Sequence, residues 1–299
     1  MDDVILSMSA IRKQQTLAKA APPVEGFGYW SGRDVRVEFR PAEVDTGIVF
    51  VRGDLPRCPR IPARIENRAE MPLRTSLCHD GAGVEMVEHI LAVLAGLRID
   101  NCEVWVDESE MPGCDGSALP FLDAVLAAGV VIQDAPRQRK VLRETVRLGG
   151  ADAWIEARPA PTGLPGLRYD LDYGLVSSIG CQTFQVELSP ETFRKELAPC
   201  RTFMLKSEAD RLLAQGLGRR VTPRDLLVYD DKGPIGNALR FPNECVRHKL
   251  MDLVGDLALA GCDLVGSFHA CRSGHRLNAE MVRTLLGRGT SVAEWKRCA

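Results

Sequence analysis

The sequence predicts an α+β protein that contains two copies of one structural unit, facing each other. In each copy, a helix that opens with the pattern V-x-H ends in Ala-Gly and is followed by a strand, a turn of small residues and a second helix. The copies extend from Val87 to Ala128 and from Val246 to Leu286. Repeated sequence units usually fold into repeated structural units, so we expect two similar domains.

Helical periodicity is clearest in the second copy. Apolar residues recur every three or four positions over 244–260, and Gly261 follows as a stop signal. This pattern predicts one long helix over that range. The other elements of the two copies are predicted as helices over 119–128 and 277–286 and as strands over 101–106 and 263–270.

Alternation of polar and apolar residues marks the strands outside the two copies. We expect 56–62 to form a loop, because both of its ends are prolines, and Ser207 to cap a helix over 208–215. The predicted strands are 35–39, 48–52, 141–148, 153–158, 167–173, 182–188 and 226–229.

A domain junction is indicated near Pro136, where a proline is followed by the charged stretch 137–140. The predicted domains are therefore 1–137 and 138–299. Within the second domain, residues 204–232 are expected to form a helix and a strand inserted before the long helix.

Composition limits the class of protein. The chain has 299 residues, of which 45% are hydrophobic and 26% charged, with a formal net charge of −2. Scattered Lys and Arg exclude a basic face for nucleic acid. Ten cysteines without C-x-x-C spacing favour reduced thiols. The first 20 residues are too polar for a signal peptide, and no apolar run approaches a membrane span, so we expect a cytoplasmic protein without a transmembrane segment.

Three polar residues share one stripe of the long helix. His248, Asp252 and Asp256 are spaced four residues apart, which makes successive pairs neighbours on the helix surface. A histidine and an aspartate one turn apart are suitable first ligands for a divalent metal such as zinc. Asp256 lies about 12 Å along the axis from His248, too far to bind the same ion. The alternative is a solvated helix face without a metal.

The first copy supplies a further candidate ligand. A catalytic zinc site takes three protein ligands and keeps one position open. If the two copies face each other, His89 comes close to His248, because both occupy the same position in the V-x-H pattern. Glu88 accompanies His89, and a carboxylate beside a metal ligand is suited to act as a general base.

These motifs resemble a known family. The segments VEHILAVLAGLRIDN, CRTF, VRHKLMDLVGD and SGH are similar to those of the zinc-dependent UDP-3-O-acyl-N-acetylglucosamine deacetylases, over about residues 14 to 289. That family removes acetate at the committed step of lipid A biosynthesis. The resemblance implies two similar α+β domains whose helices lie between two sheets, with Zn²⁺ as cofactor and a UDP-linked acyl sugar as substrate. We expect a monomer.

The resemblance also implies roles for the site residues. His275 would protonate the leaving amine, and Asp256 would orient it. Glu88 would be the general base. The implied zinc ligands are His89, His248 and Asp252.

Three further residues are implied to contact substrate. Thr202 would hydrogen-bond the oxyanion, and Phe203 would lie against the sugar or the acyl chain. Lys249 would meet the diphosphate. In the family, the insertion corresponding to 204–232 forms the passage for the acyl chain.

The chain departs from the family pattern at several positions. Trp30 replaces a histidine, Met86 replaces a hydroxyl residue, and Arg272 replaces a lysine; residues 219–225 replace a Gly-rich stretch of the insertion. These changes leave two alternatives open. The protein could be a paralogue that deacylates another nucleotide sugar or amide, or a zinc-stabilised binding protein without catalysis.

Overall fold

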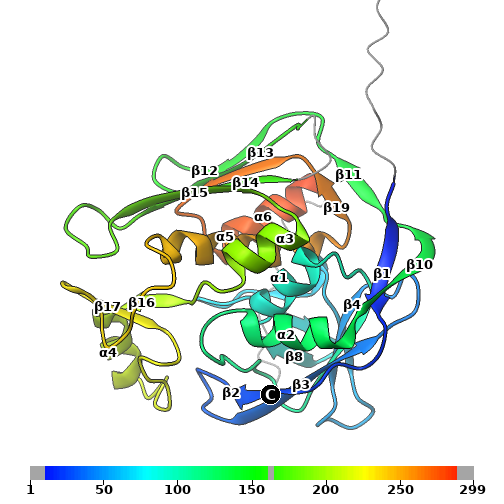
Figure 1. The fold of residues 1–299 in the computed structure, drawn as a ribbon, viewed down its shortest axis with the longest axis horizontal. Coiled ribbons are helices and arrows are strands. Elements are labelled where there is room, and N and C mark those ends of the chain that lie inside the picture. The colour runs from blue at the N-terminus through cyan, green and yellow to red at the C-terminus, as the bar shows by residue number, and fades with distance from the viewer. Residues whose placement is uncertain (1–10, 161–164, 288–299) are drawn as a thin grey trace, which may run out of the picture.

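Two five-stranded sheets enclose a layer of helices in the computed structural model, which describes residues 11–160 and 165–287 (Figure 1). This arrangement confirms the predicted fold class. The first sheet has the order β2 (Val24–Phe27), β3 (Asp34–Pro41), β9 (Cys102–Val106), β4 (Ile48–Arg52), β5 (Arg60–Pro62). The second has the order β12 (Val146–Gly149), β13 (Trp154–Arg158), β20 (Ser267–Cys271), β14 (Gly166–Asp172), β15 (Cys181–Glu187). The long helices between them are α1 (Glu88–Gly96), α2 (Leu119–Ala128), α5 (Glu244–Leu257) and α6 (His275–Leu285).

Both sheets have the same topology. In each, the first two neighbouring pairs are antiparallel, the third pair is parallel and the last is antiparallel. In each, four strands precede the first helix of the copy, and the central strand and second helix follow it. An identical order of this length supports duplication of one α+β unit.

Helices α1 and α5 pack closely enough to bring the start of α1 beside the C-terminal part of α5. A Cβ added to Gly255 would lie 2.1 Å from the carbonyl oxygen of Glu88, a distance that a side chain cannot adopt. Gly255 therefore permits the close crossing of the two helices. The buried faces of both helices join one continuous hydrophobic core.

Smaller sheets complete the fold. Strand β1 (Lys13–Leu17) pairs with β10 (Val130–Pro136), and β11 (Arg139–Val141) pairs in parallel with β19 (Asp263–Val265). A three-stranded sheet within the first copy's half of the chain consists of β6 (Arg68–Ala69), β7 (Ser76–His79) and β8 (Ala82–Glu85). Among the described residues, no helix combines the length and hydropathy that a membrane crossing requires.

The insertion within the second domain is a separate small unit. It consists of β16 (Phe203–Leu205), α4 (Lys206–Ala214), β17 (Leu227–Asp230) and β18 (Gly233–Pro234), and it projects at the lower left of Figure 1. The short helix α3 (Pro190–Thr192) and the π-helical turn Phe193–Leu197 precede it.

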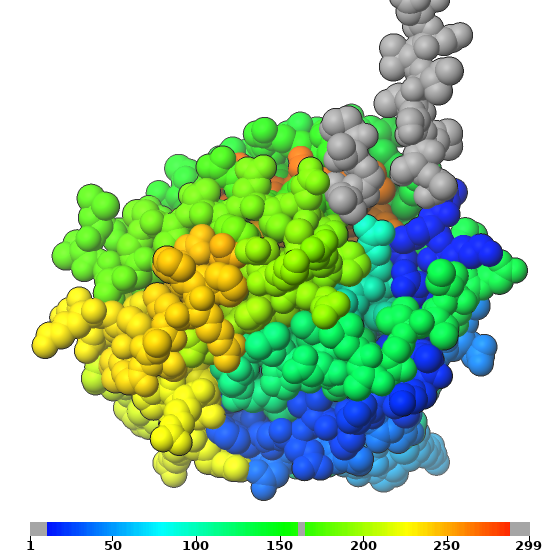
Figure 2. Space-filling view, in the orientation of Figure 1, coloured from blue at the N-terminus to red at the C-terminus, as the bar shows by residue number. Residues whose placement is uncertain are grey.

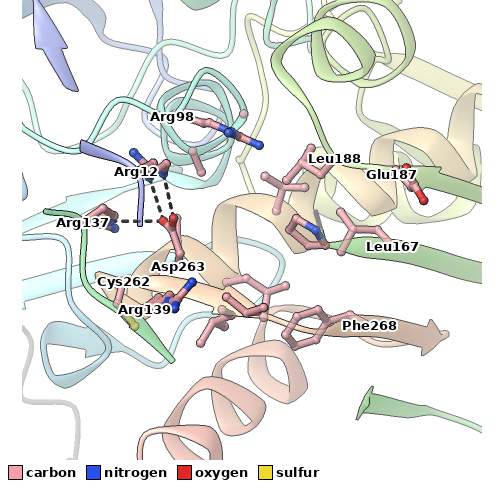
Figure 3. Close-up of a pocket in the computed structure, with 18 of the residues that line it drawn as sticks. Arg12, Arg98, Arg137, Arg139, Leu167, Glu187, Leu188, Cys262, Asp263 and Phe268 are labelled. Atoms are coloured by element: carbon pink, nitrogen blue, oxygen red, sulfur yellow. Dashed lines mark hydrogen bonds and ion pairs between the residues drawn. The ribbon is translucent and has the colours of Figure 1, made fainter. Parts of the chain in front are cut away.

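An ion-pair cluster joins the two copies at the end of α1. Arg12 contacts Asp100 (Nη1 to Oδ2, 2.6 Å) and Asp263 (Nε to Oδ2, 2.8 Å). Arg137 contacts the same two carboxylates. Figure 3 shows Arg12 and Arg137 directed at Asp263 on the wall of a cavity. Asp100 precedes β9 and Asp263 opens β19, so the arginines link corresponding positions of the two copies.

Most predicted elements are confirmed, with the bounds of α2 and β4 as expected. The prediction of a loop over 56–62 was wrong for residues 60–62, because these residues form strand β5 and pair with β4. The strand predicted over 263–270 is broken at Gly266, and its two parts join different sheets.

Two further boundaries differ from the expectation. Ser207 lies inside α4 rather than at its cap, since Leu205 occupies the N-cap position and the Glu208 side chain accepts from its backbone nitrogen (3.0 Å). The strand predicted over 141–148 is divided between β11 and β12. Half of the polar N-terminal stretch, residues 1–10, lies outside the described residues.

Candidate metal centre

Three buried side chains from the two repeated helices converge between the sheets. His89 lies in the first turn of α1, while His248 and Asp252 occupy successive turns of α5. Their potential ligand atoms all lie within 4.8 Å of one another. Oδ1 of Asp252 is 3.4 Å from Nε2 of His248 and 3.7 Å from Nε2 of His89. The duplicated helices thus assemble a His-His-Asp cluster that neither copy contains alone.

The chemistry of this cluster fits a divalent cation. Oδ1 of Asp252 is buried and has no hydrogen-bond partner among the described residues. A buried carboxylate oxygen without a donor is costly, and a cation held between it and the imidazoles would remove that cost. Nδ1 of His248 lies 3.1 Å from the carbonyl oxygen of Cys200, which orients the ring and leaves Nε2 for the ion.

The electrostatics keep these three side chains in the protonation states that a metal would require. Burial, together with His248, lowers the pKa of His89 to about 3. Burial also lowers the pKa of His248. Burial opposes ionisation of Asp252, but the histidines and Lys249 hold its pKa below its usual range. Neutral imidazoles beside an ionised carboxylate are the protonation states that bind divalent metals.

Glu88 lies beside the cluster at the start of α1. Its side chain is buried, and Oε2 accepts a hydrogen bond from the backbone nitrogen of Thr75 (3.0 Å). Burial raises the pKa of Glu88 to about 7, although His275 acts in the opposite direction. A carboxylate with a pKa near neutrality can both accept and return a proton, which suits a general base.

His275 opens α6 and pairs with a carboxylate of α5. Its Nδ1 lies 2.9 Å from Oδ2 of Asp256, which also accepts from Asn278 Nδ2 (2.8 Å). Oδ1 of Asp256 accepts from the Thr75 hydroxyl (2.6 Å). Burial alone would lower the pKa of His275, but the charge and hydrogen bond of Asp256 raise it to about 9. The imidazolium form therefore predominates at neutral pH.

Two of the remaining predicted site residues, Phe203 and Lys249, lie close to members of the cluster. The Phe203 ring meets the His248 ring edge-on at 6.2 Å between centroids, and Lys249 Nζ lies 5.7 Å from the Phe203 centroid. Lys249 also contacts Asp252 Oδ2 at 2.9 Å. Thr202 lies between Cys200 and Phe203, both of which contact His248, and its backbone nitrogen donates to Gly116 (2.8 Å).

Sequence reasoning missed several polar residues of the site. Asn278 follows His275 by three positions on α6, so helical spacing alone was a usable signal. Ser273 Oγ donates to Asn278 Oδ1 (2.8 Å) and extends the network around Asp256. Thr75 lies in a segment without periodicity or motif, and its position depends on tertiary structure.

Two departures from the family pattern have defined environments. The Arg74 guanidinium lies over the Trp30 ring, with Cζ 4.5 Å from the ring centroid. The Trp30 backbone nitrogen donates to Glu110 Oε1 (2.7 Å). In the altered part of the insertion, Arg220 Nη1 contacts Asp34 (2.7 Å) and thereby ties the insertion to the first domain.

Comparisons with known proteins show the family of the chain. A family model described as UDP-3-O-acyl N-acetylglycosamine deacetylase matches residues 14–287. Proteins named UDP-3-O-acyl-N-acetylglucosamine deacetylase from Brucella ovis, Brucella canis and Brucella suis are each 38% identical over 281 residues, which cover 93% of this chain and 96% of theirs. The chain belongs to the family of UDP-3-O-acyl N-acetylglycosamine deacetylases.

Proposed function

We propose that this protein hydrolyses the N-acetyl group of a UDP-3-O-acyl-N-acetylglucosamine, releasing acetate, in lipid A biosynthesis. One observation carries the proposal. In a chain of this family, a His-His-Asp cluster lies beside a carboxylate whose pKa is raised to about 7 and a histidine whose pKa is raised to about 9. Amide hydrolysis needs a base for the attacking water and an acid for the leaving nitrogen, and these two groups meet that need.

We propose zinc as the resident metal, held by His89, His248 and Asp252. Two imidazoles and one carboxylate with an open position form a common donor set of hydrolytic zinc sites. Bound zinc would supply Lewis-acid polarisation of the amide carbonyl.

Glu88 has the environment of the general base. Oε2 is engaged by the Thr75 backbone, which leaves Oε1 to accept the proton of the attacking water. As the water oxygen bonds to the carbonyl carbon, Glu88 becomes neutral, a change that its burial favours.

His275 is suited to donate the second proton. With Nδ1 bound to Asp256, Nε2–H is available to the departing nitrogen. When the C–N bond breaks, this proton passes to the amine, and the imidazole becomes neutral. Before that step, the imidazolium stabilises negative charge on the tetrahedral oxygen.

Three more residues would contact the substrate in this proposal. The Thr202 hydroxyl would donate to the oxyanion, and the Phe203 ring would pack against the sugar or acyl chain. Burial lowers the pKa of Lys249, but the charge of Asp252 raises it above its usual range, so Lys249 is a stable cation. Its ammonium group would contact the diphosphate. Residues 204–232 would form the acyl passage.

The proposal includes a monomer in the cytoplasm. All of the proposed site residues come from one chain, so one copy contains the groups that the reaction needs. Cys102, Cys200 and Cys245 are buried free thiols, which fits a reducing compartment.

Acetate release from purified protein tests the proposal. The zinc-loaded protein is incubated with the 3-O-acylated UDP-sugar and, separately, with UDP-N-acetylglucosamine. We expect rapid release from the first and little from the second. Preferred release from the unacylated sugar would identify a paralogue with another substrate. Release from neither, with metal bound, would overturn the proposed hydrolysis and favour a binding protein.

A further inference from the structure

We propose that Thr75 is a positioning residue that holds the base Glu88 and the carboxylate Asp256, the partner of the acid His275, in one fixed relation. The inference rests on the proposed hydrolysis. Thr75 touches neither the metal cluster nor the expected substrate position in any contact that the structure gives, so it would act through its two partners.

All three polar groups of Thr75 are used at this junction. Its backbone nitrogen donates to Glu88 Oε2 (3.0 Å), and its hydroxyl donates to Asp256 Oδ1 (2.6 Å). Its carbonyl oxygen accepts from the nitrogen of Val87, the residue before Glu88 (3.3 Å). Thr75 has an exposed fraction of 0%, so water does not compete for these bonds.

Thr75 connects two elements that belong to different copies of the repeat. Glu88 opens α1, and Asp256 lies in the last turns of α5. The two helices cross where Gly255 faces the Glu88 carbonyl. Thr75 comes from a third element, the segment before β7, and therefore bridges the crossing from outside both helices.

The hydroxyl of Thr75 fixes the rotation of the Asp256 carboxylate. Oδ2 accepts from His275 and Asn278, and Thr75 is the donor to Oδ1 among the described residues. Without this hydroxyl, Oδ1 would be a buried oxygen lacking a donor, which is unfavourable. The carboxylate would then rotate toward other donors, and the His275 imidazole that is hydrogen-bonded to it would change its orientation.

The segment that carries Thr75 is itself held on one side. Arg74 Nε contacts Glu85 Oε2 (2.7 Å), and its guanidinium covers the Trp30 ring. Leu73 has a φ of 63°, a backbone conformation that residues other than glycine rarely adopt. The contacts of Arg74 therefore hold the chain directly before Thr75, two residues after this unusual backbone conformation begins.

The adjacent residue provides a matched control. Ser76 is also a buried hydroxyl residue, 2% exposed, but its Oγ has no hydrogen-bond partner among the described residues. Removing this hydroxyl leaves no broken bond. Ser76→Ala therefore tests loss of a buried hydroxyl directly beside Thr75 without loss of the network.

The first experiment compares Thr75→Val, Thr75→Ser and Ser76→Ala for acetate release from the 3-O-acylated UDP-sugar. Thr75→Val keeps the shape and the backbone donor and removes the hydroxyl. We expect kcat to fall about 10- to 100-fold, as for loss of a hydrogen bond to a charged group, with KM and zinc content near those of the parent. Thr75→Ser should restore kcat to within a few-fold, and Ser76→Ala should resemble the parent.

A double-mutant cycle separates positioning from general destabilisation. If Thr75 acts through Asp256, Thr75→Val should lower kcat little further in an Asp256→Asn background. Should Thr75→Val not fold, Thr75→Ala takes its place in the cycle. A parental kcat in the Val or Ala variant, or a full multiplicative loss in the Asp256→Asn background, would overturn the inference.

Proton NMR gives a readout that does not depend on turnover. The Nδ1–H resonance of His275 in the zinc-loaded protein should shift in Thr75→Val and return toward the parental position in Thr75→Ser. An inactive parent would count against the proposed hydrolysis. An active parent with an unmoved resonance and an unchanged kcat in Thr75→Val would count against the role of Thr75 alone.

Discussion

The imidazole of His275 and the buried carboxylate of Asp256 form a hydrogen-bonded pair, with Nδ1 2.9 Å from Oδ2. Asp256 lies one turn beyond Asp252 on α5 and takes no part in the His-His-Asp cluster. Its negative charge is therefore directed at the histidine. As a result, the pKa of His275 is raised to about 9, although burial alone would lower it.

This pair predicts the basic limb of the activity profile. His275 donates a proton, so the competent form is present below its pKa and is lost as pH rises through about 9. Asp256→Asn removes the charge that favours the imidazolium, so the basic limb of kcat/KM against pH should move to lower pH. Zinc content should remain parental, because Asp256 lies outside the cluster.

His275→Ala checks the assignment of that limb. Without the imidazole, the limb near pH 9 should disappear and the remaining rate should be low. A normal basic limb in His275→Ala would remove His275 from the role of acid. An unmoved limb in Asp256→Asn would separate the pairing from catalysis.

Glu88→Gln should retain the metal and lose most turnover. The amide has nearly the same shape and can still accept from the Thr75 backbone, but it cannot take a proton. We expect kcat to fall by about 10²- to 10⁴-fold, the range for loss of general-base catalysis. The surface variant Glu191→Gln is the control. A Glu88→Gln rate within a few-fold of the parent would exclude Glu88 as the base.

Much of this site was predictable because the sequence repeats itself. The V-x-H pattern placed His89 and His248 at matching positions, and the structure brings their rings to 5.1 Å between centroids. Helical spacing on α5 places Asp256 about 12 Å along the axis from His248, too far to bind the same ion. Local periodicity also predicted α2 and β4 with the bounds that the structure has.

Features that depend on tertiary partners were not predictable. Strand β5 exists because Ile61 pairs with Phe50, although the prolines around it favour a loop. Thr75 reaches Asp256 across 181 positions of the chain, a contact that no local pattern contains. The division of the chain at residue 137 stays a prediction, and so do the roles of all the site residues, from the proposed metal ligands, base and acid to Thr202, Phe203 and Lys249.

Removal of one imidazole should release the metal. His248→Ala leaves two ligands from the cluster, and a site of that kind binds zinc far more weakly than one with three. Metal analysis after dialysis should show loss of the ion. His79→Ala is the matched control, since His79 lies outside the cluster and pairs with Asn67. Full metal content in His248→Ala would exclude the proposed ligand set.

The Arg12 contacts predict a stability effect far from the proposed chemistry. Arg12 binds Asp100, whose side chain is 2% exposed, and also Asp263, so Arg12→Ala leaves two carboxylates with fewer donors. Arg137 still reaches both, which limits the loss to about 1.5–3 kcal/mol, the range for hydrogen bonds to charged groups. The urea midpoint should fall, while zinc content and KM stay near parental values.

Lys13→Ala separates the buried contact from a general effect of removing a positive charge. Lys13 neighbours Arg12 and pairs with Asp134, but both side chains are exposed, so loss of that pair should leave the midpoint almost unchanged. Because Asp100 and Asp263 occupy corresponding positions of the two copies, a large effect of Arg12→Ala would mean that this N-terminal residue stabilises the association of the copies. Equal midpoints for the two variants would show instead that Arg137 alone satisfies both carboxylates.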